Sequence, residues 1–171
     1  GLAHQVAMPE LLPPEQCVDF TELLASDGRM DAQTIAQIEM PRPFEMRSHR
    51  PPLAARATGH YQWFRLRSGI GDDPLLPRAF LAVASDMGLL SSSMLPHALT
   101  WTTPGVQSTS LDHAMWFHDD VRVDDWFVYV MDSDWTGHTR GMNHGRIYQQ
   151  GRLVATTAQE GLVRYKPPLS A

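Results

Sequence analysis

Apolar residues dominate the stretch DDPLLPRAFLAVASDMGLLSSSML, residues 72–95. Asp72 or Asp73 can help to start a helix here, and Pro77 suits a position in its first turn. Around this helix, apolar side chains leave almost no polar face. They are Ala79, Phe80, Leu81, Ala82, Val83, Ala84, Met87, Leu89 and Leu90. The pattern predicts one long helix that is buried on all sides, so a sheet should wrap it.

Strand-like patterns lie on both sides of this helix in the sequence. FEMRSH and HYQWFRLR precede it, and the aromatic residues of the second favour a pleated surface. Four further segments follow the helix, near residues 107–118, 125–134, 138–149 and 153–165, and QQG between the last two is typical of a tight hairpin. One buried helix followed by hairpin-linked strands predicts an antiparallel sheet curled around that helix. This α+β arrangement is the hotdog architecture.

Residues 1–43 differ in composition from the rest of the chain, because they are rich in proline. Two short helical stretches are predicted in this segment, near EQCVDFTELLAS and DAQTIAQIE. Each offers only a narrow apolar stripe, so we expect both to dock on a larger body. The sequence therefore predicts a connector arm over residues 1–43 and a folded domain over residues 44–171.

The length of 171 residues leaves room for one domain. A net charge of -5 offers no basic face for phosphate groups, so we expect neither a nucleic-acid partner nor binding to an anionic membrane. No apolar run approaches the roughly 20 residues of a membrane span, and we expect no membrane insertion. The single cysteine, Cys17, excludes an intramolecular disulfide framework and agrees with a reducing compartment. We expect a cytoplasmic protein.

Two histidines occur close together in TSLDHAMWFHDD, residues 109–120. In a strand, alternation places His113 and His118 on opposite faces, and in a helix a separation of five also turns them apart. A shared metal ion is therefore disfavoured, and we expect no metal site. The interpretation we favour for each histidine alone is a polar side chain satisfied by neighbouring backbone.

Asp86 is the only ionisable residue in the otherwise apolar segment FLAVASDMGLL. Burying a carboxylate without partners is costly. One hypothesis is structural: the helix ends near Gly88, or Asp86 bonds to backbone. The other is functional: Asp86 is a general base whose pKa is raised by burial.

Gln159 shows a similar anomaly in LVATTAQEGLVR. Alternation with a period of two places this amide on the core face with Leu153, Ala155 and Val163. A buried glutamine that satisfies a backbone group explains this position on its own. However, Ser110, Asp86 and Gln159 come from three elements expected to pack together.

Other kinds of nucleophile and phosphate-binding motif are missing from the sequence. There is no G-x-S-x-G elbow and no phosphate loop, and Cys17 lies in the arm without a visible histidine partner. Water is then the natural nucleophile.

Several blocks now resemble, in order and spacing, the carboxyl-terminal half of the acyl-CoA thioesterase II family. They are ASDMGLL (84–90), SLDHAMWFH (110–118), RGMNHGRIYQQGRLVA (140–155) and QEGLVRY (159–165). The match covers nearly the whole chain, and GLAHQVAMP resembles the start of the connector that follows the family's first hotdog repeat. We therefore expect the second half of a double hotdog.

The resemblance implies hydrolysis of fatty acyl-CoA to a fatty acid and CoA, without a cofactor. It also implies an Asp, a Thr or Ser, and a Gln around the attacking water, and these fall on Asp86, Ser110 and Gln159. Two departures accompany the match. Ser110 stands where threonine is more usual, and Asp119 and Asp120 stand where the family has Arg-Pro.

The hydrolysis hypothesis comes with candidate substrate contacts. Apolar side chains for the acyl group are Met87, Leu89, Leu90 and Met115, and basic side chains for the CoA phosphates are Arg140 and Arg146. The oxyanion of the tetrahedral intermediate could be held by a backbone N–H near Gly88. Direct attack of Asp86 to form an anhydride is the alternative route.

Two rival functions remain open. A hotdog hydratase acting on enoyl thioesters would need an Asp and His pair, for which His113 is the candidate. A non-catalytic half would instead supply an acyl-binding wall to a missing repeat. Because a lone sheet leaves an edge strand exposed, we expect a homo-oligomer or pairing with an amino-terminal hotdog repeat.

Overall fold

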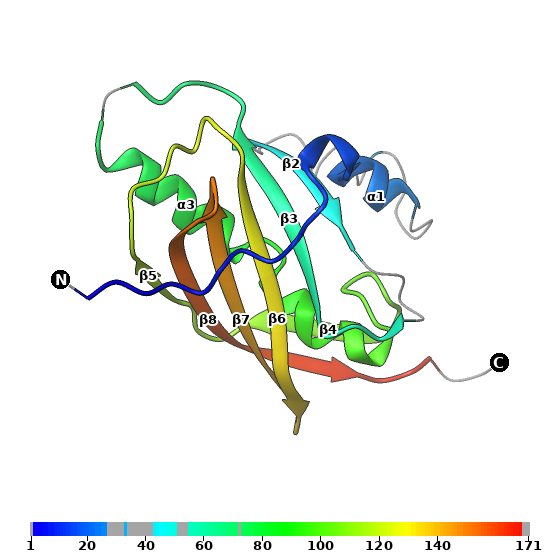
Figure 1. Cartoon of the computed structure of the whole chain (residues 1–171). Coiled ribbons are helices and arrows are strands. Elements are labelled where there is room, and N and C mark those ends of the chain that lie inside the picture. The colour runs from blue at the N-terminus through cyan, green and yellow to red at the C-terminus, as the bar shows by residue number, and fades with distance from the viewer. Residues whose placement is uncertain (1, 27–32, 34–42, 51–54, 72, 169–171) are drawn as a thin grey trace.

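The computed structural model describes residues 2–26, 33, 43–50, 55–71 and 73–168. Its main feature is an eight-stranded antiparallel sheet in the order β1-β2-β3-β6-β7-β8-β4, with β5 also paired to β8 (Figure 1). The strands are β1 Val18–Asp19, β2 Phe44–His49, β3 Gly59–Leu66, β4 Val106–Ser110, β5 Ala114–Phe117, β6 Phe127–Gly137, β7 Arg140–Gln149 and β8 Arg152–Tyr165.

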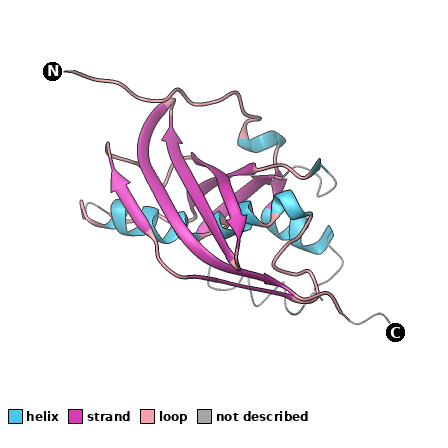
Figure 2. Cartoon of the chain, turned by 90° about the horizontal axis from the view of Figure 1, so that it is seen from below, coloured by secondary structure: helices cyan, strands magenta, loops and turns pink. Residues whose placement is uncertain are grey.

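The predicted α+β arrangement is confirmed. The sheet curves over the helical segments, which lie in its hollow (Figure 2). The predicted strand segments match the observed ones closely, except that the segment near residues 107–118 is divided into β4 and β5. The hairpin between β7 and β8 is also confirmed: Gln150 and Gly151 both have positive φ, 51° and 77°, as a two-residue turn with the twist of the flanking strands requires.

The predicted long helix is divided at Gly88. Helix α3 spans Leu76–Asp86, and the chain continues in two short 3-10 helices, η3 Leu89–Ser93 and η4 Leu95–His97. Gly88 has a φ of 91°, a left-handed conformation that an α-helix cannot continue through. The prediction of one unbroken helix is corrected at this point.

The prediction that the helix is buried on all sides is wrong. Leu81 and Ala84 are buried, whereas Val83 is 50% exposed. One sheet covers only one face of a helix, and composition does not reveal how many faces are covered. By length and composition the segment Leu76–His97 could also cross a bilayer, but this is weak evidence, because half of it is buried in the fold as the core helix of a domain would be.

The main core lies between α3 and the inner face of the sheet. Its centre is aromatic: the rings of Phe64 and Phe127 stack with centroids 5.6 Å apart, and Phe44 meets Phe64 edge to face at 5.9 Å. Leu81 of α3 packs into the same cluster. This packing holds the end of α3 against the strands from which the polar side chains of the site extend.

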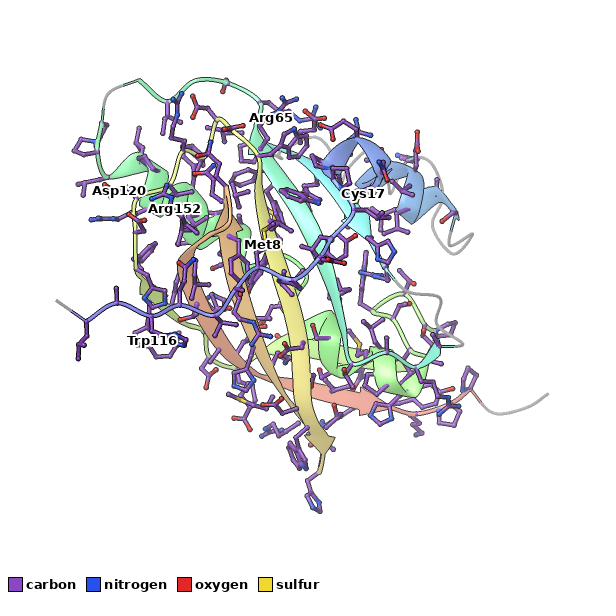
Figure 3. The ribbon with its side chains drawn as sticks, viewed as in Figure 1. Met8, Cys17, Arg65, Trp116, Asp120 and Arg152 are labelled. Atoms are coloured by element: carbon purple, nitrogen blue, oxygen red, sulfur yellow. The ribbon has the colours of Figure 1, made fainter. Side chains whose placement is uncertain are left out.

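The described part of the arm crosses the outer face of the sheet, where Figure 3 labels Met8. Met8 and Leu11 pack on a second cluster that contains Cys17, and the indole N–H of Trp63 donates to Leu12 O at 3.0 Å. The first predicted helical stretch, EQCVDFTELLAS, is confirmed in part. It overlaps two short helices, η1 Pro14–Gln16 and α1 Phe20–Ser26, which are separated by β1. The second stretch, DAQTIAQIE, lies outside the described residues apart from Gln33.

A β-bulge corrects one detail of β8. Ile147 pairs with Ala155, but the next pair joins Tyr148 to Leu153, so Val154 is an extra residue. Val154 and Ala155 both lie in the main core, and Leu153 packs on the outer cluster instead. Leu153 therefore does not share the face of Gln159, because a bulge reverses the alternation.

Candidate active site

Asp86 is the last residue of α3 and lies beside the turn at Gly88. Its side chain is 61% exposed. The structural hypothesis that the helix ends near Gly88 is confirmed, and the expectation of a buried carboxylate is wrong. A base at this position therefore depends on its partners rather than on burial.

The amide of Gln159 is the direct partner of this carboxylate. Gln159 Nε2 donates to Asp86 Oδ1 at 2.8 Å, although the two residues are 73 positions apart in sequence. Gln159 is fully buried on β8, and its backbone carbonyl accepts a hydrogen bond from Asn143 Nδ2 at 3.3 Å. Its Oε1 atom is buried without a hydrogen-bond partner. The core-side orientation predicted for Gln159 is confirmed.

His113 joins this pair to the body of α3. Its Nδ1 lies 3.1 Å from Gln159 Nε2, its Nε2 lies 2.8 Å from Ser85 Oγ, and Asp86 Oδ1 is 4.0 Å away. The expectation that backbone groups satisfy His113 is wrong, because both ring nitrogens contact side chains. The sequence signal that could have revealed this is alternation, which places His113 on the same face as the apolar Leu111, Met115 and Phe117.

A buried tyrosine on β6, Tyr129, contacts the last turn of α3. Tyr129 Oη donates to the backbone oxygen of Ser85 at 2.9 Å and lies 2.7 Å from Thr157 Oγ1. Burial is the main cause that raises the pKa of Tyr129 above its usual value, and the nearby Asp86 charge adds to it. Tyr129 is therefore a neutral phenol that fixes the last turn of α3.

His118 lies apart from this cluster. Its Nε2 is 2.9 Å from Thr156 Oγ1 on β8. Thr156 and Thr157 alternate along the strand, and Thr157 is the one that bonds Tyr129 in the core. The prediction that the two histidines lie on opposite faces is confirmed, and a metal shared by them would need both on one side.

Ser110, the third residue of the predicted trio, lies outside the contact between Asp86 and Gln159. It ends β4 opposite Gly161, one diagonal step from Gln159, which corresponds to roughly 7–8 Å between Cα atoms. Alternation places it on the same face as Ser108. Ser110 is exposed, and among the described residues it makes no side-chain hydrogen bond with either partner.

A pocket of about 280 Å³ opens beside Asp86. Two of the residues predicted to contact the acyl group, Met87 and Leu90, line it. The other two do not: Leu89 is fully buried in the main core and Met115 packs against it. The rest of the lining is Phe20, Met46, Arg50, Gln62, Gly88, Ser91, Met94, Trp101 and Ser108.

The predicted phosphate contacts, Arg140 and Arg146, lie on the other face of the sheet. Gly145, next to Arg146, faces Tyr129 in the core, so alternation turns Arg146 outward. Arg146 pairs there with Asp132, and Arg140 Nε lies 3.8 Å from Glu160. Their position on the face opposite the pocket, and their pairing with acidic residues, do not support the prediction that they bind the CoA phosphates.

The same outer face carries one group in the described residues that could hold a metal ion. The candidate ligand atoms of Asp132, Asp134 and His144 lie within 4.8 Å of one another. Asp132 already pairs with Arg146, and His144 Nδ1 lies 3.1 Å from Asp134. This group is separated by the sheet from the pocket beside Asp86, so it has no place in the candidate active site.

The arrangement defines a carboxylate at the mouth of a mixed pocket, oriented by a buried amide. An exposed carboxylate with one oxygen fixed by a hydrogen bond keeps its second oxygen available to accept a proton. This geometry suits general base catalysis on water more than nucleophilic catalysis by a side chain. Ser85 is hydrogen bonded to the His113 ring, but it is fully buried and its hydroxyl donates to Ala82 O.

Known structures share this fold. A protein with a hot dog fold from Alicyclobacillus acidocaldarius superposes on 98% of the chain with a TM-score of 0.67 at 16% identity, a likeness of fold alone. The acyl-CoA thioesterase II TesB2 from Mycobacterium marinum superposes on 97% of the chain with a TM-score of 0.75 at 35% identity. Fold and site together define a hotdog protein with a carboxylate and amide pair beside a pocket.

Sequence comparison identifies the family. Residues 34–162 match the family described as Acyl-CoA thioesterase. The curated acyl-coenzyme A thioesterase 8 of Mus musculus is 34% identical over 184 aligned positions, which cover 99% of this chain and 56% of the relative. The chain therefore belongs to the acyl-CoA thioesterase family. It spans a little over half the length of this relative and 59% of the TesB2 chain.

Proposed function

We propose that the protein containing this chain hydrolyses acyl-CoA thioesters to a carboxylic acid and CoA. The observation that carries the proposal is the hydrogen bond from Gln159 to Asp86 beside the pocket. The family membership of the chain, and the name of its relative from Mus musculus, support the same reaction.

In the proposed step, Asp86 accepts a proton from a water molecule while the water oxygen bonds to the thioester carbonyl carbon. The carbonyl electron pair moves to oxygen in this addition. When it returns, the carbon–sulfur bond breaks, and the CoA sulfur takes the proton from Asp86 and leaves as the thiol. Gln159 keeps one carboxylate oxygen occupied, which leaves the other free for the water. The Oε1 atom of Gln159 is enclosed in the core, so Gln159 acts on the water through the carboxylate that it orients.

Two further groups complete the proposed mechanism. Ser110, on the same face as Ser108, supplies a hydroxyl that helps to hold the water. The backbone N–H of Gly88, which lines the pocket, is the candidate donor to the oxyanion. The acyl group lies in the pocket against Met87 and Leu90.

The rival hydratase function is less well supported. It requires His113 to exchange a proton with the substrate, but both nitrogens of this ring are occupied by Ser85 and Gln159. A substrate group would have to displace one of two buried partners.

The partner of the chain is also a proposal: a second hotdog unit covers the edge formed by β5 and α3. Three large apolar side chains at this edge, Leu111, Trp116 and Phe117, are exposed, and Figure 3 labels Trp116 there. Val83 on the uncovered side of α3 adds to the apolar surface. A pairing of this kind would cover both the free strand edge and the exposed face of α3. The second unit is either a copy of this chain or an amino-terminal repeat.

The deciding experiment measures thiol release from medium-chain and long-chain acyl-CoA by the chain alone and by the chain joined to a first repeat. Asp86→Asn and Gln159→Leu should each abolish most of the activity. Asp120→Asn, which changes an exposed carboxylate on the loop after β5, is the matched control and should leave it intact. If neither form releases thiol, the chain is a non-catalytic half.

A single turnover in water labelled with heavy oxygen separates the two chemical routes. Direct attack places the label in the fatty acid alone. Label in the side chain of Asp86 would show that the carboxylate attacks first and forms an anhydride.

A further inference from the structure

We propose that His113 is a positioning residue, which holds the amide of Gln159 in the one orientation that donates to Asp86. The inference rests on the proposed function for its catalytic consequence, but its structural basis is independent. His113 is not part of the trio of Asp86, Ser110 and Gln159.

Four hydrogen bonds run in sequence from α3 to Asp86. Ser85 Oγ donates to Ala82 O at 2.8 Å, and His113 Nε2 lies 2.8 Å from Ser85 Oγ. Gln159 Nε2 then lies 3.1 Å from His113 Nδ1 and 2.8 Å from Asp86 Oδ1. Both ends of this chain, a carbonyl and a carboxylate, can only accept.

The acceptors at the two ends determine every donor between them. Because Ser85 gives its only proton to Ala82 O, it must accept from His113, so the ring carries its proton on Nε2. The unprotonated Nδ1 then accepts from Gln159, whose second amide proton goes to Asp86. One hydroxyl proton, one imidazole proton and two amide protons satisfy the four bonds with none left over.

The reversed amide is disfavoured at both contacts. With Oε1 in the place of Nε2, an oxygen would face the carboxylate of Asp86 and the lone pair of His113 Nδ1. If only Asp86 faced the amide, a rotation of the carboxylate could relieve part of this repulsion, because Asp86 is exposed. The ring of His113 is more enclosed, its side chain being 23% exposed, and Ser85 fixes it.

The break between β4 and β5 brings His113 into reach. Leu111 N donates to Glu160 O at 3.0 Å, and Glu160 N donates to Asp112 Oδ1 at 2.7 Å. These two bonds replace regular pairing with β8 at this point and hold the chain on the strand that carries Gln159. His113, the next residue, therefore meets Gln159 rather than solvent.

Two variants of His113 separate positioning from simple packing, measured in the chain joined to a first repeat. His113→Asn retains an acceptor near the position of Nδ1, whereas His113→Leu removes it at similar size. We expect His113→Asn to keep kcat within about threefold of wild type, and His113→Leu to lower kcat by roughly 10- to 100-fold at an unchanged KM. Equal kcat values for the two variants would overturn the proposal, provided that their melting temperatures agree within a few degrees.

Nuclear magnetic resonance of the imidazole nitrogens tests the geometry without any turnover. At pH 8, where an ordinary histidine is neutral, His113 should show a protonated Nε2 and an unprotonated Nδ1. The double variant Ser85→Ala/Gln159→Leu, which removes both partners of the ring, should mix the two tautomers. A proton on Nδ1 in the wild-type chain contradicts the proposal. The nitrogen signals can show the expected tautomer even if neither the chain alone nor the chain joined to a first repeat releases thiol. In that case the proposed function fails, but the proposed orientation of Gln159 is retained.

Discussion

Gln159 Nε2 of β8 donates a hydrogen bond of 2.8 Å to Asp86 Oδ1 at the end of α3. The bond joins the last strand of the sheet to the helix in its hollow. A fully buried amide thereby fixes a carboxylate that is itself mostly exposed. The core therefore holds the orientation of Asp86 while its side chain stays accessible to solvent.

Gln159→Glu should make the stability of the chain depend on pH. The change places a second carboxylate against Asp86, and repulsion raises the pKa of the pair in the folded state above its unfolded value. The folded state then binds the shared proton more tightly than the unfolded state, so stability present at pH 5 is lost as the pH rises toward 8. Urea unfolding at both pH values measures this loss. Gln159→Leu adds no charge and serves as the control; if both variants change in parallel, the repulsion is absent.

Ser110→Ala and Ser108→Ala distinguish two hydroxyl groups on one face of β4. If Ser110 helps to hold the water, Ser110→Ala should lower kcat by roughly 10- to 100-fold, as removal of a group that acts in the transition state does. Ser108 lines the pocket, so Ser108→Ala should alter mainly KM. Steady-state kinetics with one acyl-CoA suffices. The opposite result would assign the catalytic hydroxyl to Ser108.

Gly88→Ala should destabilise the turn that follows Asp86. An alanine at a φ of 91° costs about 1–2 kcal/mol, and its Cβ would lie 2.9 Å from Gln62 Oε1. Gly151→Ala has a similar backbone penalty at a φ of 77° but no neighbour within 4 Å. We expect the Gly88 variant to lose more free energy of unfolding than the Gly151 variant, and to lose activity as well. Equal losses would show that Gln62 moves aside freely.

His60 should make the fold sensitive to acid. Burial lowers the pKa of His60 to about 3, with a smaller contribution from the Arg50 charge. An unfolded histidine has a pKa near 6.5, so below that pH only the unfolded state takes up the proton. The free energy of unfolding should therefore fall by about 1.4 kcal/mol per pH unit between pH ~6.5 and ~3.

The contribution of His60 can be isolated by replacement. His60→Leu should flatten this part of the pH profile in chemical denaturation, because the leucine binds no proton in either state. His4→Ala, a change in an exposed residue of the arm, should leave the slope as it is. An unchanged slope in His60→Leu would mean that other groups cause the acid sensitivity.

Trp116→Ser and Phe117→Ser should weaken association of the chain with itself or with a first repeat. Both side chains are exposed at the β5 edge, at 54% and 42%, so their loss removes apolar surface without opening the core. Sedimentation velocity at several concentrations measures the effect. Trp135→Ser, at a similarly exposed tryptophan near the end of β6, is the control. If all three variants associate as strongly as the wild-type chain does, the interface lies elsewhere.

Much of the fold was predictable because local periodicity determines local structure. The strands around FEMRSH and after residue 125 follow from alternation, and the turn between the last two strands follows from QQG, in which Gly151 adopts a positive φ without strain. That Asp86 and Gln159 need hydrogen-bond partners was also visible, since a polar group in an apolar segment must find one. The sequence did not show that each is the partner of the other.

Only the tertiary structure decided how these residues are exposed and paired. Sequence patterns report which side chains are apolar, but burial depends on how many layers cover them, which is why α3 keeps Val83 in solvent and Asp86 remains accessible. The contacts among Ser85, His113 and Gln159 depend on the curvature and register of the sheet and on the break between β4 and β5. These are long-range properties: alternation determines the face on which a side chain lies, and only the folded sheet determines which distant residue meets it there.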